Sequence, residues 1–334
     1  MSVYLESCLA PLAQYLARPD TTDIFINRPG EIWIERLGSS PSRIEIHELT
    51  GPLLQRLARQ VAAINAQGIN RENPLLSGSL PTGERVQIVM PPATRGEIAF
   101  AIRKHVMTDV GLDDYEAGGA LDDIRFPSQL TGSRTDFRFE RGDATAKEFL
   151  REAVKEKKNI LISGGTSSGK TTFLNALIRE IPSDERLIFI EDTPELKLVH
   201  ENAVGLIAPR GTLGEAKVGV EDLLVGALRM RPDRIILGEM RGTEALTFLR
   251  AINTGHPGSL STIHADSPER ALDQLTLLVL QANIGLSWED TLRYVCKSVD
   301  LVVQLERRDG IRRVCSVLRS TSSISAPMSS SPPT

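Results

Sequence analysis

The fold follows from one stretch, Asn159-Ile-Leu-Ile-Ser-Gly-Gly-Thr-Ser-Ser-Gly-Lys-Thr-Thr172. Its apolar run at 159–163 predicts a buried strand, and the segment from Lys170 onward predicts a helix. Between the two, residues 164–171 fit the pattern G-x-x-x-x-G-K-[ST], in the strand-to-helix context that this pattern requires. We therefore predict a nucleotide site here, and the alternative is a purely structural glycine-rich turn.

The small residues of this loop explain how it would bind phosphate. They let the backbone point its N–H groups at an anion, and the helix N-terminus adds the positive end of its dipole. Lys170 would bridge the β- and γ-phosphates of ATP, and the hydroxyl of Thr171 would ligate Mg²⁺. The predicted nucleotide-binding residues are Gly164, Gly165, Thr166, Ser167, Ser168, Gly169, Lys170, Thr171 and Thr172.

Strands and helices alternate along the rest of this half of the chain. Further strands are predicted at 187–190, 234–238 and 259–264, and helices at 220–230, 243–253, 267–282 and 287–297. Alternation of this kind predicts an α/β fold with a mostly parallel sheet covered on both faces. Two last strands, 300–306 and 311–317, flank Asp309-Gly310 and predict a hairpin.

Three chemically active side chains stand where predicted strands end. Glu191 follows the strand 187–190, Glu239 follows 234–238, and His264 closes 259–264. Ligands of open parallel sheets bind at the carboxyl ends of the strands, so these side chains should converge on the nucleotide. One carboxylate would activate the attacking water, the other would hold Mg²⁺ through water, and His264 would contact the γ-phosphate. The alternatives are that Glu191 and Glu239 are simply solvated acids at strand ends and that His264 has a structural role.

The domain organisation follows from changes in pattern. Helices at 3–17 and 50–65, mixed with strand-like runs at 23–27, 31–35, 85–90 and 98–103, predict a small α+β domain over 1–105. Residues 106–146 read as an acidic linker with a short helix near 121–130, or else as a surface excursion of one domain. The ATPase domain is predicted over 147–319, and the Ser/Pro-rich residues 320–334 are predicted to be a disordered tail.

Composition excludes several classes. The 334 residues carry 39 Lys+Arg and 43 Asp+Glu, a net charge of −4, which disfavours a surface that grips nucleic acid. The 3 cysteines are far apart, which excludes a disulfide framework or a CxxC metal site. No apolar run approaches the length of a membrane span, and no signal peptide is visible, so the cytoplasm is the expected compartment.

Four motifs in order carry a resemblance to a known family. They are the phosphate loop, Ile190-Glu-Asp-Thr-Pro-Glu-Leu196, the run from Leu228 to Arg241, and Thr254-Gly-His-Pro-Gly-Ser-Leu-Ser-Thr-Ile-His-Ala-Asp266. Residues 23–35 and 80–92 also look like the N-terminal domain of that family. The chain resembles, over roughly 20–318, the hexameric traffic ATPases of type IV secretion and conjugal (P-type) DNA transfer, within the type II/type IV secretion ATPase superfamily.

The resemblance implies a homo-hexameric ring in which a RecA-like P-loop NTPase domain follows the smaller N-terminal domain, with ATP in the cleft between them. It implies Glu191 as the water-activating base, Glu239 as the Walker B acid and His264 as the γ-phosphate sensor. Arg85 and Arg103 would neutralise charge on the transferring phosphate, in cis or in trans. Arg241 matches a family position without an assigned role.

By the same resemblance, the ring would act at the cytoplasmic face of the inner membrane. It would bind other type IV secretion components there, make peripheral membrane contact, and drive substrate export or pilus assembly. Two alternatives stay open: an assembly scaffold switched by nucleotide, and a RecA-like translocase that binds nucleic acid directly. The cargo, DNA or a protein effector, is open as well.

Overall fold

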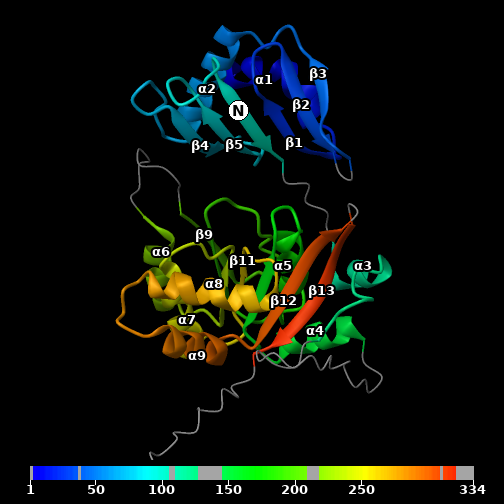
Figure 1. Cartoon of the computed structure of the whole chain (residues 1–334), viewed down its shortest axis with the longest axis vertical. Helices are drawn as coiled ribbons and strands as arrows, with labels where there is room; N and C mark the ends of the chain where they lie inside the picture. The colour runs from blue at the N-terminus through cyan, green and yellow to red at the C-terminus, as the bar shows by residue number, and fades with distance from the viewer. Residues whose placement is uncertain are drawn as a thin grey trace, which may run out of the picture. The chain divides into compact units, whose positions relative to one another are not determined.

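The computed structural model describes residues 3–36, 39–104, 110–126, 145–208, 218–308 and 311–320. The chain divides into two compact units (Figure 1). The first comprises Met1–Asp109, Glu191–Glu195 and Leu206–Leu223, and the second comprises Val110–Ile190, Leu196–Gly205 and Leu224–Thr334. The predicted tail beyond residue 320 and residues 127–144 of the predicted linker lie outside the described residues.

The first unit is built on a 6-stranded sheet in the order β3-β2-β1-β6-β5-β4, with antiparallel neighbours. Its core joins side chains of the sheet to those of two helices. In the second helix, the Thr50 side chain accepts a hydrogen bond from the Leu53 N–H, which caps the first turn. The elements are α1 (Val3–Leu16), β1 (Thr21–Ile26), β2 (Glu31–Arg36), β3 (Ser42–Glu45), α2 (Gly51–Ile64), β4 (Leu75–Ser79), β5 (Arg85–Val89) and β6 (Ala99–Arg103).

The second unit contains a 7-stranded sheet in the order β13-β12-β7-β11-β10-β8-β9. Strands β12, β7, β11, β10 and β8 run parallel, and β13 is antiparallel to β12. The strands are β7 (Ile160–Gly164), β8 (Leu187–Glu191), β9 (Ala203–Ile207), β10 (Arg234–Leu237), β11 (Leu260–Ile263), β12 (Leu301–Arg308) and β13 (Ile311–Arg319).

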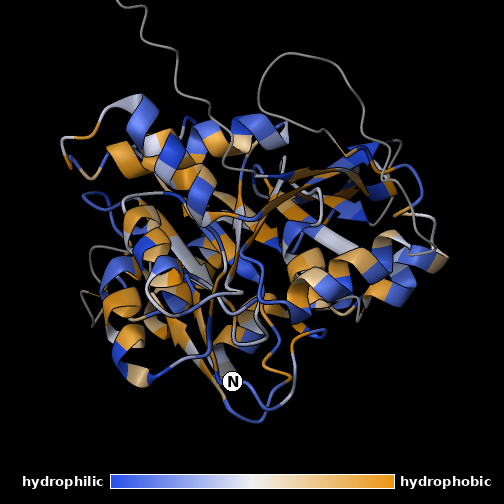
Figure 2. Cartoon of the chain, turned by 90° about the horizontal axis from the view of Figure 1, so that it is seen from below, coloured by the Kyte–Doolittle hydropathy of each residue, from blue (hydrophilic) through white to orange (hydrophobic). Residues whose placement is uncertain are grey.

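Helices cover this sheet. The helices are α3 (Leu112–Ala117), α4 (Ala146–Lys155), α5 (Lys170–Ile178), α6 (Val220–Ala227) with a 3₁₀ turn at Leu228–Met230, α7 (Glu244–Asn253), α8 (Pro268–Leu280) and α9 (Trp288–Ser298). Side chains of α3, α4 and α5 share one core with Ile160 and Ile162 of β7. Because side chains alternate along a strand, the buried Leu161 points to the other face. Both faces of β7 are thus buried, and the helices carry hydrophobic and hydrophilic residues together, as amphipathic helices do (Figure 2).

The α/β class and the mostly parallel sheet predicted from the sequence are confirmed. Apart from the short helix expected near 121–130, the predicted helices and strands are present with ends shifted by a few residues. Three short strands, β3, β4 and β9, were not predicted, because their polar and glycine-containing segments show little hydrophobic alternation. The short helix of the acidic stretch lies at Leu112–Ala117; residues 121–126 are not helical.

The described part of the acidic stretch packs into the second unit. Leu112 and Tyr115 of α3 are buried there, and the ring of Tyr115 meets that of Phe173 edge-on at 5.1 Å. Two buried apolar positions in a six-residue helix are a weak signal beside its acidic residues, which explains why the sequence pattern placed the helix elsewhere.

Candidate functional site

The phosphate loop lies between the end of β7 at Gly164 and the start of α5 at Lys170. Gly169 caps α5 with φ of +93°, a left-handed conformation that favours glycine. At Gly164 a Cβ would lie 2.7 Å from the backbone oxygen of Leu305, so the neighbouring strand excludes any side chain. The loop therefore needs glycine at both ends for reasons that the structure makes explicit.

Lys170 is buried within this loop. Its Nζ donates hydrogen bonds to the carbonyl oxygens of Gly164, at 2.9 Å, and Gly165, at 3.1 Å. The pKa of Lys170 is lowered to about 8, chiefly by burial. The negative charge of Glu239 raises this pKa in part, and the positive charge of Arg241 lowers it further. The side chain is therefore mostly protonated at pH 7 and loses its proton as the pH rises above about 8.

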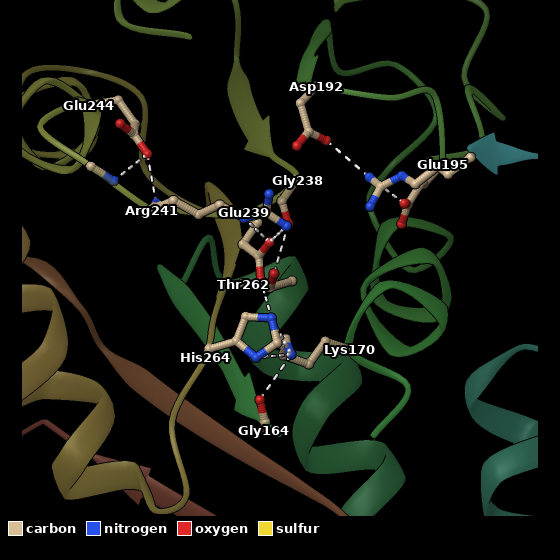
Figure 3. Close-up of polar contacts among 12 residues, drawn as sticks. Gly164, Lys170, Asp192, Glu195, Gly238, Glu239, Arg241, Glu244, Thr262 and His264 are labelled. Atoms are coloured by element: carbon tan, nitrogen blue, oxygen red, sulfur yellow. Dashed lines mark hydrogen bonds and ion pairs between the residues drawn. The ribbon is translucent and has the colours of Figure 1, made fainter. Parts of the chain in front are cut away.

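Glu239 and His264 meet Lys170 at the carboxyl ends of β10 and β11 (Figure 3). The His264 Nε2 lies 2.8 Å from Oε1 of Glu239, and the Lys170 Nζ lies 3.3 Å from the other ring nitrogen of His264. The guanidinium of Arg241 pairs with the other carboxylate oxygen of Glu239. The predicted convergence of Lys170, Glu239 and His264 is thus observed within the second unit.

Hydrogen bonds fix the loop that carries Glu239 and Arg241. The Thr262 hydroxyl donates to the Gly238 carbonyl at 2.8 Å, next to Glu239. Glu244 accepts from the backbone N–H groups of Arg241, at 2.7 Å, and Gly242, at 2.8 Å (Figure 3). Sequence reasoning missed Glu244, although an acidic residue at the start of a predicted helix is a known capping signal.

Gln304 of β12 is a second residue that the sequence reasoning missed. It is buried, accepts a hydrogen bond from the Ser163 hydroxyl, and donates to the Ala265 carbonyl at 3.1 Å. It therefore joins the residue before the phosphate loop to the residue after His264. The available signal was one polar residue inside the apolar run Leu301-Val-Val-Gln-Leu305.

Glu191 lies at the end of β8 and belongs to the first unit. It is buried, and its Oε1 accepts a hydrogen bond from the backbone N–H of Glu195 at 2.8 Å. In the same unit, Arg85 forms ion pairs with Asp192 at 3.0 Å and with Glu195 at 2.5 Å. This arginine therefore contacts the motif that carries Glu191.

Arg103, the other predicted arginine, has a different environment. It lies on β6, and its Nε contacts Oδ1 of Asp23 on the neighbouring β1 at 2.9 Å. Its side chain is 49% exposed, so this pair contributes little to folding.

The loop chemistry fits a nucleotide. The Ser168 hydroxyl oxygen is buried and has no hydrogen-bond partner among the described residues, as expected for a group that binds a ligand oxygen. Thr171 and Thr172 stand in the first turn of α5, next to Lys170. Among the described residues, no group of three or more His, Cys, Asp or Glu side chains forms a metal cage. Mg²⁺ that keeps its waters and uses one or two protein oxygens, such as those of Thr171 and Glu239, fits this donor set.

None of the helices that the structure describes combines the length and the apolar character needed to span a membrane.

The chain is similar to proteins of a known family. Residues 135–327 match the family model described as "Type II/IV secretion system protein". The VirB11 protein of a type IV secretion system from Bartonella quintana is 38% identical over 325 residues, 92% of this chain and 91% of that protein.

Two solved structures agree as well. The VirB11 ATPase of the Brucella suis type IV secretion system, in complex with sulphate, is 37% identical, with 95% of each chain covered and a TM-score of 0.50. The pilus retraction motor PilT with bound ADP shares the fold at 20% identity, covering 96% of this chain and 84% of that one, with a TM-score of 0.60. The chain therefore belongs to the type II/IV secretion system protein family, among the ATPases of type IV secretion.

Proposed function

We propose that this chain hydrolyses ATP as the motor of a type IV secretion system. The observation that carries the proposal is the joining of Lys170, His264 and Glu239 at the end of a phosphate loop. A buried lysine that is charged at neutral pH can bind phosphate oxygens, and a carboxylate and an imidazole lie beside it. Phosphoryl transfer uses groups of these kinds to position the phosphates and to stabilise their charge. The family relationship supports the same activity.

The residues of the loop would bind the phosphates of the substrate. The Lys170 ammonium would exchange the carbonyls of Gly164 and Gly165 for oxygens of the β- and γ-phosphates. The backbone N–H groups of residues 165–172 would hold the same phosphates. Mg²⁺, when bound with ATP, neutralises charge on the phosphate oxygens. Thr171 would hold that ion directly, and Glu239 through water.

The remaining residues would act on water and on the terminal phosphate. We assign Glu191 to orient and deprotonate the attacking water, because it is a buried carboxylate at a strand end. His264 would report the γ-phosphate to Glu239, to which its ring is already joined. Arg85 and Arg103 would stabilise the charge that builds up on the transferred phosphate. The ion pairs of Arg85 with Asp192 and Glu195 support this role for Arg85.

The proposal includes an assembly and a location. Six copies of the chain would form a ring at the cytoplasmic face of the inner membrane. The ring would contact other secretion components and the membrane surface peripherally, and it would energise substrate export or pilus assembly. The relationship to VirB11 proteins of type IV secretion systems supports this part.

The test is ATP turnover by the purified full-length chain, measured together with its native mass. Wild type is compared with Lys170→Ala, Glu191→Gln and Glu239→Gln. Matched controls are Lys158→Ala and Glu156→Gln, half-exposed or exposed residues that precede the opposite, amino end of β7. We expect a native mass near six times the 36.6 kDa chain mass. Turnover should fall at least about 100-fold in the three site variants, and by less than about two-fold in the controls.

Other outcomes contradict specific parts of the proposal. Turnover that survives Glu191→Gln would move the general base elsewhere. A wild-type chain that binds ATP without hydrolysing it would indicate a nucleotide-switched scaffold. Strong, salt-sensitive stimulation of turnover by DNA would indicate a nucleic-acid translocase.

A further inference from the structure

The hairpin β12–β13 runs past the phosphate loop. Strand β12 pairs in parallel with β7 up to the match of Leu305 with Gly164, where β7 ends. The hairpin continues for several residues beyond that point, and there Arg307 of β12 faces Arg312 of β13. The outer part of the hairpin therefore extends alongside the loop 165–169, at the carboxyl edge of the sheet.

Arg312 approaches this loop closely. A Cβ placed on Gly169 would lie 2.9 Å from Cδ of Arg312 and 3.7 Å from its Nε. The arginine side chain thus occupies the space beside Gly169, the residue that caps the N-terminus of α5. A side chain at position 169 would displace Arg312, which gives this glycine a second reason besides its left-handed backbone.

The charge of Arg312 is not neutralised by its described surroundings. Among the residues that the structure describes, no carboxylate pairs with Arg312 and no acceptor receives a hydrogen bond from it. Arg312 lies close enough to Tyr115 to act on its phenol, whose pKa is raised to about 12 by burial and lowered in part by the guanidinium. An unpaired guanidinium therefore stands at the N-terminus of α5, where the helix dipole is positive.

A positive guanidinium beside the positive end of a helix dipole is electrostatically unfavourable, and a bound anion between them would make it favourable. Lys170, a second cation and itself buried, is the next residue after Gly169. The buried hydroxyl of Ser168, which has no hydrogen-bond partner in the part of the chain that the structure describes, points independently to a ligand oxygen in the same loop. A guanidinium presents a planar fork of N–H donors that matches phosphate oxygens.

We propose that Arg312 is a further nucleotide-binding residue, which contacts the phosphate chain of the nucleotide held by the loop 164–172. The inference rests on the proposed function, because it takes ATP as the ligand of that loop. It adds a cation from the last strand of the sheet to those that the sequence motifs predict. The hairpin would then be part of the nucleotide site.

The test measures binding by the full-length chain through displacement of a fluorescent ATP analogue. The competitors are ATP and inorganic tripolyphosphate, which carries the phosphates without the nucleoside. The variants are Arg312→Gln and Arg312→Lys. The matched control is Arg308→Gln, which removes the same charge from an exposed residue of the same hairpin, opposite Ile311.

We expect Arg312→Gln to weaken ATP and tripolyphosphate alike, by about 10-fold to 100-fold. The slope of affinity against salt concentration should become shallower, Arg312→Lys should restore part of the affinity, and Arg308→Gln should change it by less than about two-fold. Weakening of ATP alone would overturn the phosphate assignment in favour of stacking on the base. Unchanged affinity for both competitors, or equal losses in Arg312→Gln and Arg308→Gln, would overturn it entirely.

The proposed function is tested separately in the same assay. If wild type binds neither competitor, or Lys170→Ala binds as wild type does, the nucleotide site itself is disproved. If Lys170→Ala loses binding while Arg312→Gln keeps it, only the assignment of Arg312 fails. Far-UV circular dichroism of each variant checks the fold, and we expect Arg312→Lys to be folded because it keeps the methylenes and the charge.

Discussion

Strand β10 has a charged cluster at each end, and the two clusters differ in how far their side chains are exposed to solvent. Arg234 opens the strand and is fully buried. Its guanidinium donates two hydrogen bonds of 2.7 Å to Glu185 and one of 2.7 Å to the Val154 carbonyl. At the other end, Glu239 meets His264 and Arg241, whose side chains are 49% and 45% exposed.

The difference is the one expected between charge that stabilises the fold and charge that we propose to act on a ligand. At the amino end, the paired groups are buried, and the contacts hold α4 and the segment before β8 to the strand. At the carboxyl end, the groups are paired as well, but His264 and Arg241 are half-exposed and lie near a lysine whose pKa is lowered, a combination typical of ligand sites. Parallel strands place their ligands at this end, which explains why the two clusters are not interchangeable.

The comparison predicts its largest effect for Arg234→Met. Removing this guanidinium leaves Glu185 buried without its main partner, so we expect the free energy of unfolding to fall by about 3–5 kcal/mol. Urea titration followed by circular dichroism measures the loss. The control Arg270→Met removes an arginine that is 72% exposed and contacts Asp266 at 3.5 Å. It should cost less than about 1 kcal/mol. A loss this small in Arg234→Met would show that the amino-end cluster is not structural.

Glu239→Gln should reduce ATP turnover strongly and leave the free energy of unfolding nearly unchanged. The change keeps the size of the side chain and removes a charge that we assign to holding Mg²⁺ through water, so turnover of ATP should fall about 100-fold or more. The free energy of unfolding should change by less than about 1 kcal/mol, because the partners of Glu239 are half-exposed. Paired turnover and urea measurements test both statements. A stability loss as large as that of Arg234→Met would remove the distinction between the clusters.

Gln304→Leu tests a residue that belongs to both categories. The change leaves the Ser163 hydroxyl and the Ala265 carbonyl without their partner, and we expect a cost of about 1–3 kcal/mol in the free energy of unfolding. Turnover should fall as well, because both neighbours adjoin the site. The control Gln87→Leu alters an exposed glutamine of β5 and should leave both quantities nearly unchanged. Wild-type stability in Gln304→Leu would contradict the joining role.

The pH dependence of ATP binding should show the smallest effect. Since the pKa of Lys170 is lowered to about 8, the free protein loses this charge above that pH, while bound phosphate favours the charged form. We expect affinity to be nearly constant below pH 7 and to weaken about tenfold by pH 9. The control Lys170→Arg keeps its charge throughout and should bind with no such step. A wild-type profile flat to pH 9 would place the pKa of Lys170 well above 8.

Lys170 also contributes to the pH dependence of stability, with a definite sign. Its pKa is lower in the folded chain than in the unfolded one, so the unfolded chain binds more protons between pH 8 and 10.5. The cost that this residue adds to folding therefore decreases as the pH rises through that window, and it is absent above it. Its contribution is unfavourable below it.

Local patterns were enough to identify the phosphate loop, Glu239 and His264. Residues 164–171 form a contiguous motif whose chemistry depends on neighbours in sequence, and Glu239 and His264 were found because they follow short apolar runs. Gln304 and Arg312 lie more than 130 residues from the loop that they adjoin. The polarity of Gln304 within an apolar run marks it as unusual but does not indicate that loop, and the segment of Arg312 carries no comparable signal. Arg103 was predicted as a site residue from the sequence, but its ion pair with Asp23 depends on the pairing of two strands and could not be predicted from either segment alone.

The sequence by itself determined the α/β class, the phosphate loop and the identity of the charged groups, because periodicity and motif spacing are local properties. The tertiary structure alone decided which charges are buried with their partners and which are half-exposed at the carboxyl edge of the sheet. It placed Arg234 and Glu239 at opposite ends of one strand and brought the hairpin beside Gly169. Burial and partner distance depend on strand order in the sheet, and strand order is fixed by packing between segments far apart in the chain.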